Sequence, residues 1–135
     1  MDVPTRAPAL AGSVLGTADN NFVIAEWRDA GGPPTPPRWI APLHVHHADD
    51  EAWYVLEGKL GVRIGDEEIE AAEGAAVLVP RGKAHTYWNA GEGPLRYLLV
   101  MTPNIYNLIQ AIHSTKDRSR EGMQALFRRH NSELL

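Results

Sequence analysis

Short apolar runs alternate with turn-forming residues from Trp39 to Met101, and this alternation is the strongest constraint on the fold. Within one run, Leu60, Val62 and Ile64 recur at every second position, as expected of a strand with one buried face. Turns containing glycine or proline separate the runs "WIAPLHVHH", "EAWYVLE", "LGVRI", "IEAA", "AAVLV", "HTYWN" and "LRYLLVM". With the earlier run "NFVIAEW", the pattern predicts seven or eight short strands and an all-β sandwich or barrel.

Both ends of the chain differ from this central region. The first twenty residues are rich in alanine and proline, and we expect them to form an arm (1–20) that is ordered only by packing. Thr102 and Pro103 suit the cap and first turn of a helix. Helical spacing follows in Ile105, Leu108, Ile109 and Ile112. We therefore predict a β-barrel over 21–102 and a tail of one or two helices over 103–135, packed on its outside in a structural role.

The composition excludes several kinds of chemistry and several partners. The chain has no cysteine, so disulfides and thiolate ligands are absent and any metal must be held by nitrogen and oxygen. Thirteen basic and 17 acidic residues give a net charge of -4 without a basic stripe, which argues against nucleic acid. No apolar run reaches the roughly 18 residues of a membrane span, and the first twenty residues make a poor secretory signal. We expect a cytoplasmic protein.

Potential metal ligands are concentrated in "HVHHADDE", residues 44–51. A strand projects alternate residues to one face, so His44 and His46 lie about 6.6 Å apart and can bind the same metal ion. Glu51 follows His46 at an odd offset, which an unbroken strand turns to the other face, but "HADD" can form a turn that resets the phase. His85 is expected to open a strand after a type I turn at "VPRG" and to supply a fourth ligand.

These four side chains can be interpreted as a metal site or as ordinary polar residues at strand ends. Three neutral imidazoles and one carboxylate suit a divalent first-row metal ion, and an octahedral ion would keep two positions open. Taken alone, however, "HVHH" favours a polar strand end, and only together with a second motif containing His85 does it favour a metal site. His47 has odd parity relative to His46 and is expected to face away, with substitution as a ligand as the alternative.

Two motifs resemble those of the cupin superfamily. "HVHHADDEAWYVLEG" has the form H-x-H-x4-E-x6-G, and "GAAVLVPRGKAHTYWN" has the form G-x5-P-x-G-x2-H-x3-N, with 15 residues between them. The second motif matches at every fixed position, whereas the first has Arg38 in place of the family's leading glycine. The resemblance implies a cupin-type jelly-roll β-barrel, often dimeric. It places the metal ligands at His44, His46, Glu51 and His85.

The resemblance also implies the cofactor, which is one divalent transition metal ion. Iron, manganese, nickel, zinc and copper all suit nitrogen-rich ligation, so the ligands do not choose among them. Strand parity then predicts an apolar pocket beside the metal, because Ile40 shares the His44 face, Trp53 and Val55 share the Glu51 face, and Tyr87 shares the His85 face. The alternative is that Trp53 and Tyr87 simply belong to the core.

Three functions remain open at this point. The first is a dioxygenase, an oxidoreductase that acts on a small apolar or aromatic substrate carrying oxygen, with Glu51 as a ligand that detaches to act as a base. The second is a non-redox isomerase, cyclase or lyase, and the third is a binding or sensing module without turnover. The single-domain length favours an enzyme. A small molecule is the expected partner, and an exposed strand edge predicts a homodimer.

Overall fold

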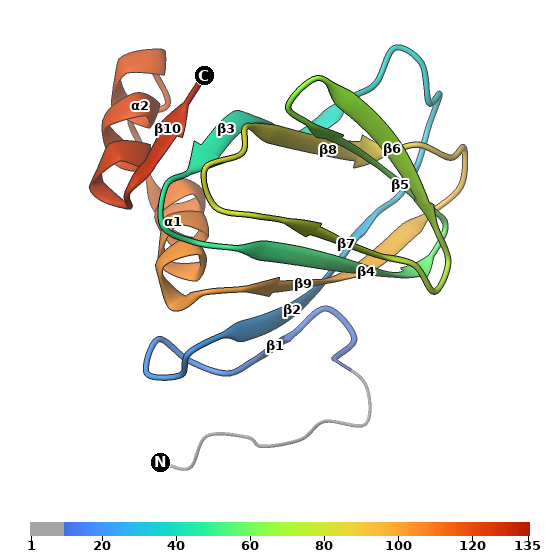
Figure 1. Ribbon diagram of the computed structural model, residues 1–135, viewed down its shortest axis with the longest axis horizontal. Coiled ribbons are helices and arrows are strands. Elements are labelled where there is room, and N and C mark those ends of the chain that lie inside the picture. Colours follow the sequence, from blue (N-terminus) through green and yellow to red (C-terminus); the bar gives the residue numbers. More distant parts are fainter. Residues whose placement is uncertain (1–9) are drawn as a thin grey trace.

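The computed structural model describes residues 10–135, which form two antiparallel sheets packed face to face with two helices at one end (Figure 1). The first sheet has the order β1 (Val14–Leu15), β2 (Val23–Asp29), β9 (Leu95–Met101), β4 (Glu51–Glu57) and β7 (Ala76–Val79). The second sheet has the order β10 (Ser132–Leu134), β3 (Trp39–His46), β8 (His85–Asn89), β5 (Lys59–Ile64) and β6 (Glu67–Ala72). The helices are α1 (Pro103–Ser114) and α2 (Arg120–Arg129). The predicted jelly-roll architecture is confirmed, with two separate sheets in place of a closed barrel.

The core lies between the two sheets and is built from alternate residues of the strands. In β9, for example, every second side chain is buried, from Leu95 to Met101. Side chains of β4 and β5 meet these residues from the other strands, among them Val55 and Leu60. Position 61 in β5 requires glycine for a steric reason, because a Cβ atom there would lie 2.3 Å from the ring of Trp88. Glycine lets that indole pack closely against the backbone of β5.

The helical tail begins as its sequence predicts but contains one more element. The Thr102 side chain accepts a hydrogen bond from the Ile105 amide, which caps α1. After α2, however, the chain forms β10, an edge strand of the second sheet that the sequence pattern did not reveal. Three residues are too few to show a strand periodicity. Its partner is β3, the strand that carries two of the predicted ligands.

The N-terminal segment is likewise more regular than a simple arm. β1 pairs antiparallel with β2, Val14 opposite Ala25, and extends the first sheet at its edge. Residues 1–9 of the predicted arm lie outside the described residues. Within residues 10–135, neither helix has the length and apolar character that crossing a membrane requires.

Candidate metal centre

Four side chains converge from three strands near the helical end of the two sheets. His44 and His46 lie at the end of β3, Glu51 begins β4, and His85 begins β8. All four are buried, and one potential ligand atom from each lies within 4.8 Å of the others. The structure therefore brings together the four residues that the sequence predicts as metal ligands. His47, by contrast, is exposed and lies outside this cluster.

The turn between β3 and β4 returns Glu51 to the face of the two histidines, as the sequence predicts. Asp50 fixes this turn, because its Oδ1 accepts a hydrogen bond from the backbone amide of Arg81 at 2.9 Å. The Arg81 guanidinium also pairs with Asp50, and these bonds lower the pKa of the Asp50 carboxyl. The turn before β4 is thus bonded to the turn before β8. This fixes the positions of Glu51 and His85, which begin these two strands, relative to each other.

The turn before His85 differs from the type I turn expected at "VPRG". The amide of Lys83 donates to the carbonyl of Pro80 at 3.3 Å, so the turn starts one residue later than expected. Gly82 is its third residue and has a φ of 83°, which suits a type II turn and favours glycine. The Gly82 amide donates to the carbonyl of His46 at 2.7 Å, which fastens the turn to the end of β3.

Two of the imidazoles are oriented by backbone carbonyls. Nδ1 of His44 donates to the carbonyl of Pro42 at 2.6 Å, and Nδ1 of His85 donates to the carbonyl of Lys83 at 3.0 Å. Because a carbonyl oxygen only accepts hydrogen bonds, the proton of each neutral ring lies on Nδ1. Each Nε2 atom therefore presents a lone pair to the interior of the site.

His46 is oriented by a hydroxyl group. Its Nδ1 lies 2.8 Å from Oγ of Ser132, and this hydroxyl donates its hydrogen to the carbonyl of His130 at 3.1 Å. A hydroxyl has one hydrogen, so Ser132 must accept from His46, and the proton of His46 also lies on Nδ1. All three Nε2 atoms thus face the site as lone pairs, which is the tautomer that binds a metal ion.

The distances between these ligand atoms fit a metal ion. Nε2 of His44 lies 3.2 Å from Nε2 of His46, and Oε1 of Glu51 lies 3.5 Å from Nε2 of His46 and 3.1 Å from Nε2 of His85. Two atoms bound at about 2.1 Å in adjacent positions of one octahedral ion lie about 3 Å apart. Four facing acceptor atoms in a buried site also require a cation or an added proton between them. Both the geometry and the donor set therefore suit one divalent metal ion.

The charge state of the site agrees with this role. Burial lowers the pKa of His44 to about 3, with the neighbouring His85 and His46 adding to the effect, so the His44 ring is neutral near pH 7. Burial alone would raise the pKa of Glu51, but its hydrogen bonds and charge interactions with His46 and His85 outweigh burial and lower that pKa to about 2. A metal ion bound here would meet an ionised carboxylate.

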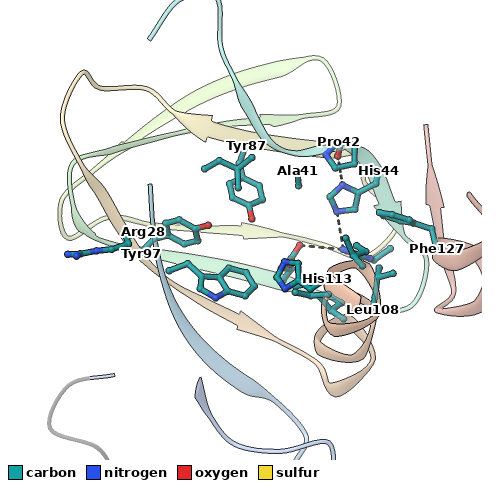
Figure 2. A pocket seen from close by; sticks show the side chains of 16 residues that line it. Arg28, Ala41, Pro42, His44, Tyr87, Tyr97, Leu108, His113 and Phe127 are labelled. Atoms are coloured by element: carbon teal, nitrogen blue, oxygen red, sulfur yellow. Dashed lines mark hydrogen bonds and ion pairs between the residues drawn. The ribbon is translucent and has the colours of Figure 1, made fainter. Parts of the chain in front are cut away.

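A cavity of about 310 Å³ adjoins the ligands (Figure 2). His44, His46 and Glu51 lie at one end, and Figure 2 shows Arg28 far from His44. The hydroxyls of Tyr87 and Tyr97 point into the space between. Burial raises the pKa of Tyr97 to about 12 and that of Tyr87 well above its ordinary value, so both phenols are neutral hydrogen-bond donors. The other side chains around the cavity are mainly apolar.

The four residues predicted for the substrate pocket divide into two pairs. Ile40 and Tyr87 line the cavity. Trp53 and Val55 do not, because they are packed between the sheets with 1% and 0% exposure. The Trp53 ring lies behind the site, 5.2 Å from the ring of Tyr87 and 5.9 Å from that of His85. Strand parity correctly predicted that the Trp53 side chain points inward, but parity does not show how deeply that side chain is buried.

The tail contributes more of the cavity than its predicted position on the outside implied. From α1, Ile105, Leu108, Ile109, Ile112 and His113 line the cavity, and α2 adds Phe127. The ring of Phe127 packs edge-on to that of His44, with the ring centres 5.7 Å apart. The amphipathic spacing of α1 indicated an apolar face, but spacing does not show what the face contacts. Ser132, Trp27 and Arg28 had no signal in the sequence that linked them to the site.

Comparison with known proteins identifies the family. A family model described as "Cupin domain" matches residues 35–101, the region that holds all four candidate ligands. The chain belongs to the cupin superfamily. Tetracenomycin polyketide synthase protein TcmJ of Streptomyces glaucescens is 35% identical to this cupin over 60 residues, which are 44% of this chain and 40% of TcmJ. The matched regions cover between 40% and 53% of the curated relatives, so this cupin spans about half of their length.

Solved structures also resemble this cupin, over 62% to 67% of its length in the two examples below. A putative sugar phosphate isomerase from Acidithiobacillus ferrooxidans is 26% identical, with a TM-score of 0.53 over 62% of this chain and 51% of that one. A conserved protein with a double-stranded beta-helix domain from Klebsiella pneumoniae is 25% identical, with a TM-score of 0.55 over 67% of this chain and 70% of that one. These likenesses agree with the two-sheet fold described above.

Proposed function

We propose that this cupin is a metal-dependent dioxygenase that acts on a small, mainly apolar substrate carrying oxygen atoms. The observation that carries the proposal is the placement of three imidazole lone pairs and one carboxylate at the end of an apolar cavity. Four protein ligands leave two positions of an octahedral ion open. A bound iron, manganese or nickel ion would supply Lewis acidity and one-electron chemistry at this point.

The chain's own residues would select and orient the substrate. The apolar wall formed by Ile40 and the α1 side chains favours an aromatic or aliphatic molecule and excludes water. The neutral hydroxyls of Tyr87 and Tyr97 would donate hydrogen bonds to its oxygen atoms. The Glu51 carboxylate is the nearest candidate base for a substrate proton, in addition to its role as a ligand.

A non-redox isomerase, cyclase or lyase is the second candidate, and the similar solved structure named as a putative sugar phosphate isomerase supports it. TcmJ is named as a polyketide synthase protein, and polyketides are apolar, oxygen-bearing molecules of the kind this cavity admits. A sugar phosphate suits the cavity less well, because a phosphate group is usually bound by several cationic side chains. Among the described lining residues, Arg28 is the only lysine or arginine, with His113 as a further polar group.

Oxygen consumption separates these candidates. The protein would be loaded with Fe²⁺, Mn²⁺ or Ni²⁺ and supplied with small phenols and diketones, with an oxygen electrode and ¹⁸O₂ product analysis as readouts. We expect oxygen uptake and ¹⁸O incorporation in the wild type and neither in His85→Ala. Turnover that is unchanged without oxygen would support the isomerase, cyclase or lyase. A ligand that raises the melting temperature without being converted would instead support a binding module.

A further inference from the structure

The C-terminal strand runs beside both ligands of β3. In the pairing of β10 with β3, Ser132 lies opposite His46 and Leu134 lies opposite His44. The hydrogen bond from the His47 amide to the Asn131 carbonyl, at 3.0 Å, continues this pairing beyond the strand. The segment after α2 is therefore a structural neighbour of the metal ligands, although it follows them late in the sequence.

Ser132 differs from the groups that orient the other two imidazoles. His44 and His85 donate to carbonyls only two positions before them, so their orientation is local to their own segments. His46 donates to a side chain 86 positions away, and Ser132 is buried with 1% exposure. The orientation of His46 thus depends on a hydrogen-bond acceptor in β10, whereas the acceptors that orient His44 and His85 lie in their own segments.

A network of hydrogen bonds holds the Ser132 hydroxyl in its accepting role. The carbonyl of His130 accepts from this hydroxyl and from Nδ2 of Asn104, at 2.7 Å from the amide nitrogen. The same Asn104 amide donates to Oδ2 of Asp49 at 2.8 Å, in the turn that precedes Glu51. Because the Ser132 hydrogen is engaged by His130, its oxygen is left with lone pairs for His46. Residues of α1, of the segment after α2 and of the β3–β4 turn are thereby joined to one metal ligand.

We propose that Ser132 is a positioning residue of the metal centre, which holds the proton of His46 on Nδ1 and its Nε2 lone pair toward the other ligands. This inference rests on the proposed metal site. Without the hydroxyl, the His46 ring can rotate or place its proton on Nε2, and either change removes one ligand from the set. Loss of such an outer partner of a metal-binding histidine typically weakens metal binding about 10- to 100-fold.

Two substitutions of equal shape test the role of the hydroxyl. Ser132→Thr and Ser132→Val add similar volume at a buried position in a strand, but only threonine keeps the oxygen. The probe is Co²⁺ alone, titrated with the visible absorption spectrum as readout. We expect Ser132→Thr to retain the wild-type affinity and spectrum, and Ser132→Val to bind about 10- to 100-fold more weakly with an altered spectrum. Ser114→Ala removes an exposed hydroxyl that contacts the Ala111 carbonyl and should change neither.

The outcomes distinguish this inference from the metal site itself. Equal Co²⁺ binding by wild type and His85→Ala would overturn the site. Binding that is lost in His85→Ala but equal in Ser132→Thr and Ser132→Val, both at wild-type strength, would overturn only the role of Ser132. If both variants bind weakly because of their added volume, Ser132→Ala decides, since it adds none. Wild-type affinity and spectrum in Ser132→Ala would then reject the proposal, and a loss in a variant whose circular dichroism is unchanged would support it.

Discussion

Oε1 of Glu51 lies 3.1 Å from Nε2 of His85, and both side chains are almost fully buried. This pair joins the start of β4 to the start of β8, and Glu51 carries the only negative charge among the four candidate ligands. Replacing the carboxylate with a neutral amide of the same shape therefore removes charge from the site with little change in packing.

Glu51→Gln is expected to raise the dissociation constant for Zn²⁺ or Mn²⁺ by at least about tenfold, because the amide oxygen is a weaker ligand than the carboxylate. Isothermal titration calorimetry measures this change. Glu73→Gln is the matched control, since Glu73 is exposed and lies outside the ligand cluster. Equal dissociation constants for Glu51→Gln and the wild type would remove Glu51 from the set of ligands.

The buried phenol of Tyr97 predicts a loss of stability in alkali. Burial raises its pKa from 10.0 in the unfolded chain to about 12 in the fold, so between these values the folded state holds a proton that the unfolded state has released. The free energy of unfolding therefore falls as the pH rises from 10 to 12, by about 2 to 3 kcal/mol for a shift of this size. Below pH 10 the phenol of Tyr97 is protonated in both states, and no stability is lost through its titration.

Urea unfolding of the wild type and of Tyr97→Phe at pH 8, 10 and 11.5 measures this effect. We expect the wild type to lose more stability than Tyr97→Phe over this range, because phenylalanine has no proton to release. Tyr87 remains in both proteins, but Tyr97 itself helps to raise the pKa of Tyr87, so the difference also contains the loss of this coupling. Parallel losses in the two proteins would show that Tyr97 titrates at the same pH in the folded and unfolded states.

Gly61 predicts a steric effect that is independent of the metal. An alanine there would place its Cβ 2.3 Å from the Trp88 ring, which is itself buried. We expect Gly61→Ala to lower the free energy of unfolding by about 1 to 3 kcal/mol through overpacking. In Gly93→Ala the added Cβ has no described neighbour within 4 Å, and a change within about 0.5 kcal/mol is expected. Urea denaturation with tryptophan fluorescence compares the two, and similar values would exclude a tight contact at Trp88.

The clustering of the four candidate ligands could be predicted from the sequence because their spacing is tied to local structure. Parity alone pairs His44 with His46, and a polar turn explains how Glu51 rejoins their face. The second motif supplied His85 through its resemblance to a family, not through geometry. The strand pattern predicted the fold for the same reason, since a period of two is a direct consequence of the pleat.

The walls of the cavity could not be predicted in the same way. β3 has register shifts on both sides of Ala41, so Ala41 lines the cavity together with Ile40 and Pro42, which strict alternation forbids. The run that contains Tyr97 is apolar at nearly every position, so its pattern did not separate the face toward the cavity from the face toward solvent. Helical periodicity identified an apolar face on α1 but not the space that it encloses.

The pairing of β10 with β3 also has a consequence for biosynthesis. A ribosome adds the four candidate ligands long before it adds Ser132, which follows His46 by 86 positions. Because that late residue accepts a hydrogen bond from His46, the arrangement of the four candidate ligands seen in the fold can be complete only after residue 132 has been synthesised.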